Sequence, residues 1–199
     1  IFTVGQGDMG SVVDNVLLAK DIESGRVSGH VIEAGSGAAA SGAKVFVYKP
    51  GMDAPWSQWT TDVAWDDTNR DGSFGGTLPL GEWEIQAHEH GRPTSERFSI
   101  VVGAEDQVLN LEIGASGTVA FEIRNEVGDI VPAKVTVMRT DADALRNPVL
   151  GDGQIGGDPE AVLFAAFGHA EVHLAPGDYT ATATRGPEYE IETLPFRID

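Results

Sequence analysis

The chain has 199 residues, with 13 Lys and Arg against 31 Asp and Glu, which gives a formal net charge of −18. This charge excludes nucleic-acid binding, because no run of Lys or Arg is present to replace phosphate counterions. Membrane insertion is excluded as well, since no apolar stretch approaches the about 20 residues that a spanning helix needs. With 41% hydrophobic residues the chain can bury a core, and its lack of Cys removes disulfides and thiol chemistry.

Residues 1–24 precede the first clear strand pattern and form an N-terminal arm. Within the arm, residues 12–20 place Val12, Val16 and Leu17 on one side, which predicts a short helix with Ser11 as its N-cap. The chain opens on Ile1 rather than Met. We therefore interpret the arm as the tail of a preceding domain in a longer protein.

Four short patterns occur twice along the chain, in the same order. Ser28-Gly-His-Val31 returns as Ser116-Gly-Thr-Val119, Ala43-Lys-Val-Phe-Val47 as Ala133-Lys-Val-Thr-Val137, Leu78-Pro-Leu-Gly-Glu-Trp83 as Leu174-Ala-Pro-Gly-Asp-Tyr179, and Phe98-Ser-Ile100 as Phe196-Arg-Ile198. Such self-similarity predicts a tandem duplication. We expect one domain over residues 25–113 and a second over residues 114–199.

Each copy has the pattern of short strands separated by turns. Val45 and Val47 alternate with Phe46 and Tyr48, which is the period of two of a sheet with one buried face. We assign residues 160–167 to extended structure rather than to a helical turn. The predicted fold class is all-β: two tandem Greek-key or prealbumin-like β-sandwiches behind a short N-terminal arm.

The first copy resembles a known family over its whole length. The motifs that carry the likeness are Val27-Ser-Gly-His-Val31, Ser41-Gly-Ala-Lys-Val45, Asp71-Gly-Ser-Phe74 and Leu78-Pro-Leu-Gly-Glu-Trp83. They resemble the carboxypeptidase regulatory-like domain, which is a transthyretin-like or starch-binding-like β-sandwich. The second copy keeps the Ala-Lys-Val strand and the Pro-Gly-Asp-Tyr turn but has Gly168-His-Ala170 in place of the Asp-Gly-x-Phe element.

Two further segments resemble a more specific setting. Thr3-Val-Gly-Gln-Gly-Asp-Met-Gly-Ser11 and Thr184-Arg-Gly-Pro-Glu-Tyr-Glu190 are similar to segments upstream of the catalytic domain in bacterial polymerase-and-histidinol-phosphatase (PHP) type metallohydrolases. This resemblance implies a non-catalytic region beside a metal-dependent hydrolase domain. The chain itself has no Gly-x-Ser-x-Gly elbow, phosphate loop or recognisable pair of catalytic carboxylates, so we expect no enzyme within it.

The segment Asp67-Thr-Asn-Arg-Asp-Gly72 matches the first half of a calcium loop. Asp67, Asn69 and Asp71 would supply oxygen ligands at alternate positions. The second half is missing, because Leu78 stands where a bidentate carboxylate is needed. A plain hairpin turn is the alternative, and calcium is the possible cofactor at this segment.

The histidines form two groups with strand spacing. His88 and His90 are expected on the solvent face of one strand, and His169, Glu171 and His173 share a face of another. The i, i+2 spacing of about 7 Å suits a shared zinc ion. Solvated polar side chains on a wet sheet face are the alternative interpretation.

Two loops are candidate recognition surfaces. Trp56, Trp59 and Trp65 fall close together, and their indoles have three possible roles: packing at the end of the sandwich, docking of a neighbouring domain, or stacking on a sugar ring. Arg185, Glu188 and Tyr189 lie in a Pro-stiffened bend that is suited to fixing a partner domain. A local salt bridge between Arg185 and Glu188 or Glu190 is the alternative there.

The leading functional hypothesis is a non-catalytic accessory region, a rigid spacer and docking platform for a catalytic domain of a longer, secreted or periplasmic protein. Its partners would be the neighbouring domains of that protein. A carbohydrate-binding module that uses the Trp56, Trp59 and Trp65 loop is the alternative, with a glycan as partner. A calcium-stabilised, adhesin-like stalk is a third hypothesis.

Overall fold

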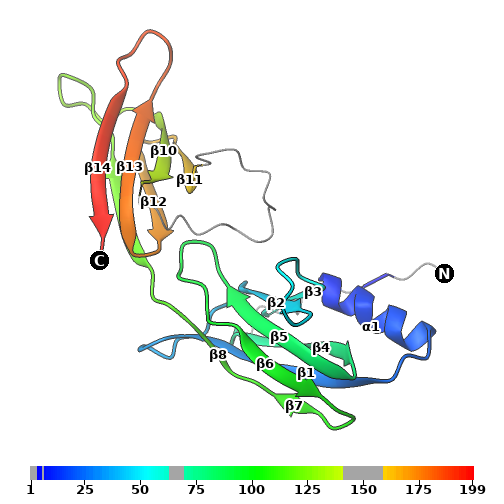
Figure 1. Cartoon of the computed structure of the whole chain (residues 1–199). Coiled ribbons are helices and arrows are strands. Elements are labelled where there is room, and N and C mark those ends of the chain that lie inside the picture. Colours follow the sequence, from blue (N-terminus) through cyan, green and yellow to red (C-terminus); the bar gives the residue numbers. More distant parts are fainter. Residues whose placement is uncertain (1–3, 6, 63–69, 141–158) are drawn as a thin grey trace. The chain divides into compact units, whose positions relative to one another are not determined.

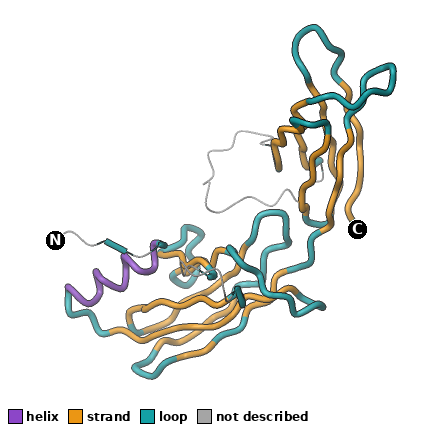
Figure 2. Tube along the Cα trace, turned by 180° about the vertical axis from the view of Figure 1, so that it is seen from behind, coloured by secondary structure: helices purple, strands orange, loops and turns teal. Residues whose placement is uncertain are grey.

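The computed structural model describes residues 4–5, 7–62, 70–140 and 159–199. These residues form one α-helix and fourteen β-strands (Figure 1). The chain divides into two compact units, Ile1–Ala115 and Ser116–Asp199. Strands and turns make up nearly all of both units, as the colouring of Figure 2 shows. The chain is therefore all-β, as its sequence predicts.

The first unit is a sandwich of two sheets. It contains α1 (Met9–Ala19), β1 (Ser24–Glu33), β2 (Lys44–Tyr48), β3 (Ser57–Thr60), β4 (Ser73–Pro79), β5 (Gly81–His88), β6 (Phe98–Val102), β7 (Gln107–Val108) and β8 (Leu111–Ile113). In one sheet β1 pairs antiparallel with β4 and parallel with β7 and β8. The other sheet has the order β3-β2-β5-β6. Side chains from both sheets, including Val27, Trp83 and Leu111, form one buried cluster between them.

The second unit repeats this topology with fewer strands. It contains β9 (Gly117–Glu122), β10 (Ala133–Arg139), β11 (Ala161–Ala165), β12 (His169–Leu174), β13 (Gly177–Thr184) and β14 (Glu192–Ile198). β9 pairs with β12 as β1 pairs with β4, and the order β11-β10-β13-β14 matches β3-β2-β5-β6. The extended structure expected for residues 160–167 is confirmed over Ala161–Ala165, which form β11, and residues 166–167 lie in the turn that follows. The repeat seen in the sequence is thus also a repeat of strand order.

Strand register corrects one of the sequence matches. Leu78 pairs with Gly25, and its counterpart Leu174 pairs with Gly117. Gly117 therefore corresponds to Gly25 and not to Gly29, which the sequence match had chosen. The ambiguity arises because Ser-Gly occurs twice in β1, and only the tertiary structure separates the two. Both corresponding glycines are required by close packing, since a Cβ at Gly117 would lie 2.4 Å from Cγ2 of Ile198 and one at Gly25 would lie 2.0 Å from a backbone oxygen.

The last matched pair is shifted as well. Trp83 pairs with Ile100, whereas its counterpart Tyr179 pairs with Phe196. Phe196 therefore takes the place of Ile100 rather than that of Phe98. The match between the two Phe-x-Ile patterns is wrong by two residues. A shift of two residues leaves each side chain on the same face of the strand, so the alternation of the sequence does not reveal it.

The turn before the fifth strand of each unit is held by the same contacts. Trp83 donates its indole N–H to the carbonyl of Pro79 (2.8 Å), and the Tyr179 hydroxyl donates to the carbonyl of Ala175 (2.7 Å). A cation from the second strand's end covers each ring: Lys49 Nζ lies 3.4 Å from the Trp83 ring centre, and Arg139 Cζ lies 5.6 Å from that of Tyr179. The large aromatic at this position is therefore a structural lock in both units.

Helix α1 begins earlier than the sequence suggests. Asp8 is the N-cap, and its carboxylate accepts the backbone N–H of Ser11 (2.9 Å). The assignment of Ser11 as N-cap is wrong, because Ser11 lies inside the first turn and its hydroxyl donates to the Asp8 carbonyl. Asp8 and Ser11 thus form two hydrogen bonds with each other at the start of the helix. The helix belongs to the first unit, where it contacts β3 and β4.

The outer face of the β2–β5 pair is covered, contrary to the expectation of a wet face. Phe46 and Tyr48 are fully buried although they point away from the core. The segment after β5 folds back over them, because Ser95 exchanges hydrogen bonds with Ala87 and Arg97 places its guanidinium 3.9 Å from the centre of the Tyr48 ring. β2, whose sequence alternation predicts one buried and one exposed face, is therefore buried on both faces.

Candidate functional site

The candidate calcium turn is only partly described. Asp67 and Asn69 lie outside the described residues. The carboxylate of Asp71 accepts the backbone N–H of Ser73 (3.0 Å), and Ser73 hydrogen bonds lower the pKa of Asp71. His30 Nε2 lies 3.5 Å from the same carboxylate. The Asp71 carboxylate therefore forms hydrogen bonds within the turn. In the part of the chain that the structure describes, no group of three or more metal-ligating side chains occurs.

The tryptophans separate into different environments. Trp59 lies on β3 and is fully buried in the core, where it stacks on Phe74 at 5.9 Å. Its role as a surface residue for a sugar or a partner is wrong, and the packing interpretation holds for it. Trp56 is 37% exposed and packs on Trp83 at 4.7 Å. Trp65 lies outside the described residues, so Trp56 is the one described member of the loop that reaches the surface.

The two histidine groups also differ. His88 ends β5 and is buried beneath Thr94, whose Oγ1 lies 3.1 Å from His88 Nδ1. The expectation of a solvent-facing His88 is wrong, and its burial, with a smaller effect of His90, lowers the pKa of the imidazole. His169, Glu171 and His173 all lie exposed on one face of β12, as expected.

The bend at residues 185–190 lines the larger of two adjoining hollows in the second unit. Arg185, Glu188 and Tyr189 border a groove of about 680 Å³ together with the turn after β9, including Val127. The Arg185 guanidinium lies 4.7 Å from the centre of the Tyr189 ring. Among the described residues Arg185 therefore stacks on Tyr189, and the salt bridge to Glu188 or Glu190 is not formed. The three residues that the sequence singled out do converge on one surface.

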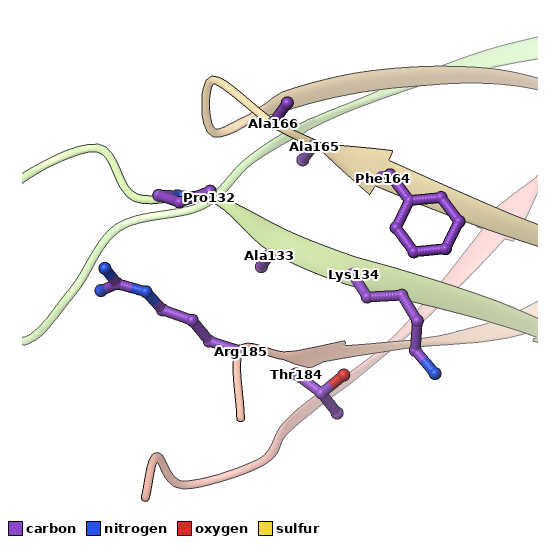
Figure 3. A pocket seen from close by; sticks show the side chains of 8 residues that line it. All are labelled: Pro132, Ala133, Lys134, Phe164, Ala165, Ala166, Thr184 and Arg185. Atoms are coloured by element: carbon purple, nitrogen blue, oxygen red, sulfur yellow. The ribbon is translucent and has the colours of Figure 1, made fainter. Parts of the chain in front are cut away.

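A second, shallower hollow of about 490 Å³ adjoins the first, and Arg185 is part of both. Figure 3 shows Arg185 extending toward Pro132 at one end of this hollow and Phe164 at the other end. Phe164 projects from β11 with its side chain 77% exposed. Phe164 was not predicted as a surface residue from the sequence. The only signal was its place beside a second phenylalanine in the run Ala161-Val-Leu-Phe-Ala-Ala-Phe167.

The larger groove has a mixed but mainly acidic rim. The charged side chains that line it are Arg124, Glu126, Arg185, Glu188, Glu190 and Glu192. Apolar surface lies between these charges, since Val127 and Tyr189 are exposed. Such a surface combines an apolar floor with charges of both signs. That combination is typical of a protein-binding surface.

Comparison with known proteins yields structural resemblances only. No protein-family model matches the chain, and no protein with a curated description matches it. Among solved structures, a Streptococcal ancillary pilin aligns with a TM-score of 0.45 and 16% identity over 90% of this chain and 60% of its own. The shaft pilin spaA from Lactobacillus rhamnosus GG gives a TM-score of 0.46 and 13% identity over 89% of this chain and 94% of its own.

A DUF3823 family protein from Parabacteroides merdae is similar at a TM-score of 0.35 and 14% identity, over 82% of this chain and 92% of its own. The match to the Streptococcal ancillary pilin covers 60% of that protein, so the chain spans less than two thirds of its length. Likeness at these levels assigns neither a family nor a function. Among the described residues, no helix has the length and apolar character needed to cross a membrane.

Proposed function

We propose that this chain is a non-catalytic structural region of a longer protein, a spacer whose second unit docks a neighbouring domain. The observation that carries the proposal is the surface around Arg185 and Tyr189. There the exposed apolar side chains of Val127 and Tyr189 line one groove with a guanidinium that stacks on Tyr189, and the exposed Phe164 lies at the far end of the adjoining hollow. Exposed apolar patches with polar rims mark interaction sites, and a pre-ordered arginine loses less entropy on binding.

The nature of the docked domain is inferred from the sequence. The segment 184–190 that forms this surface is also one of the two segments that resemble regions upstream of PHP-type metallohydrolases. We infer that the neighbour is a metal-dependent hydrolase domain and that the whole protein is secreted or periplasmic. The carboxypeptidase regulatory-like resemblance of the first unit fits the same accessory role.

The experiment compares amide exchange in the isolated chain and in the parent protein. Docking should slow exchange in residues 123–127 and 184–190, and the double variant Arg185→Ser, Tyr189→Ser should abolish that difference without unfolding the chain. Val101→Ser is the matched control, because Val101 is an exposed apolar residue of the first unit. Equal exchange in both proteins would refute the docking role.

A further inference from the structure

One edge of β9 lacks a partner strand among the described residues. β9 pairs only with β12, whereas its counterpart β1 pairs with β4 on one edge and with β7 and β8 on the other. Unpaired edges expose backbone N–H and C=O groups that readily accept another strand. The first unit therefore shows, within this chain, how the same edge is closed.

The core of the second unit is covered less completely at the corresponding positions. Val27, Val31 and Val102 of the first unit are fully or almost fully buried. Their counterparts by register are Val119, Ile123 and Ile198, which are all only half-buried. These side chains face the interior of the second unit, so part of its apolar core remains in contact with water.

The strand that closes the first unit supplies both side chains and backbone bonds. Leu111 and Ile113 enter the core and are fully buried, while Val108 points outward. The Leu109 N–H donates to the carbonyl of Ser28 (2.8 Å), and the Ala34 N–H donates to the carbonyl of Ile113 (2.8 Å). The edge of β1 thus accepts a strand that has an aliphatic side chain at every second position.

We propose that β9 binds an extended strand of polypeptide from outside residues 1–199, parallel to β9 and with an aliphatic side chain at every second position. By register, Ala120 offers its carbonyl where Ser28 does in the first unit. The incoming aliphatic groups cover Val119 and Ile123, and the backbone bonds satisfy the edge, as in other strand-addition complexes. Of the residues that this strand would cover, Ile123 also lines the groove around Arg185. The test below therefore follows residues 117–122, which are not among the residues that report on docking.

The test supplies a strand of known sequence. A copy of residues 104–114 is appended behind Asp199, because Ile198 corresponds to Val102 and the appended copy then follows β14 as β7 and β8 follow β6. Linking the strand to the chain gives it a high effective concentration. We expect amide exchange of residues 117–122 to slow by about tenfold or more relative to the unextended chain.

Two control extensions make the result specific. Leu111→Asp and Ile113→Asp in the appended copy should remove the protection, whereas Val108→Asp, which changes an outward position, should retain it. A synthetic peptide of residues 104–114, added in excess to the unextended chain, should give the same protection. Equal effects of all appended copies, or protection that rises with the concentration of the unextended chain alone, would overturn the proposal.

The first unit provides an internal reference in the same samples. All four tryptophans, at positions 56, 59, 65 and 83, belong to the first unit. Thermal unfolding followed by tryptophan fluorescence should therefore be the same with and without the appended strand. A change there would mean that the strand acts on the first unit rather than on β9.

Discussion

The two units share one strand order but differ in how their edges are closed. In the first unit, α1 covers the β3 and β4 side, and β7 and β8 cover the free edge of β1. Among the described residues, the second unit has neither element beside its β11–β12 side or its β9 edge. The difference shows that two sandwiches can share one strand order and still close their edges in different ways.

The closure by α1 depends on small residues and acidic side chains. Trp59 lies between Gly10 of the helix and Gly76 of β4, where a Cβ on either glycine would lie 2.0 Å from the indole. Asp8 accepts the Thr60 N–H (3.0 Å), and Asp14 accepts the Thr77 N–H (2.7 Å). The helix therefore satisfies edge groups of both sheets and blocks further strand pairing there.

The largest expected effect is that of Trp59→Ala. Removal of this fully buried indole should lower the free energy of unfolding of the first unit by about 3–5 kcal/mol, because a large cavity remains. Leu163 takes the corresponding place in the second unit but is only half-buried, so Leu163→Ala should cost less than about 2 kcal/mol. Urea unfolding by circular dichroism measures both, and equal costs would contradict the difference in coverage.

Gly10→Ala should come next. The added methyl group favours the helix by about 1 kcal/mol, but it must displace the Trp59 indole and should leave a net loss of about 1–2 kcal/mol. Gly103→Ala is the matched control, because a Cβ there meets no atom within 4 Å. We expect Gly103→Ala to stabilise the chain. If Gly10→Ala stabilises it as well, the helix is not packed on Trp59.

Asp14→Ala tests the polar part of the same closure. Loss of the acceptor should leave the Thr77 N–H unpaired and cost about 1–2 kcal/mol, read from urea unfolding by tryptophan fluorescence. Asp14→Asn keeps a carbonyl oxygen and should cost less. Equal stability of the alanine variant and the natural chain would show that water replaces Asp14 at no cost.

The smallest expected effect is a pH dependence confined to the first unit. Burial lowers the pKa of His88, so the unfolded chain binds a proton more readily than the folded one. Stability is therefore highest above the unfolded pKa of about 6.5 and falls as the pH drops from there toward the lowered pKa of the folded state. Unfolding midpoints of His88→Gln should lack this decrease, whereas His90→Gln should retain it.

Much of the fold follows from local patterns in the sequence. Alternating residues and Gly-containing turns predict the strands, and the repeated Ala-Lys-Val and Gly-x-aromatic motifs predict two copies, since both depend on side-chain order along the chain. Arg185, Glu188 and Tyr189 could be named because a Gly-Pro bend with a cation and an aromatic residue is informative by itself. Burial of Trp59, Phe46 and His88 could not, because it depends on segments distant in sequence.

The sequence by itself determined the all-β class, the order of the repeated motifs and the lack of a run of basic residues or a long apolar stretch, because composition and period are local properties. Only the tertiary structure decided which Ser-Gly of β1 matches Gly117, that Asp8 rather than Ser11 caps the helix, and that Trp59 is buried. It also decided which edges are closed. Each of these depends on contacts between segments that are far apart in the chain, and a local pattern carries no record of them.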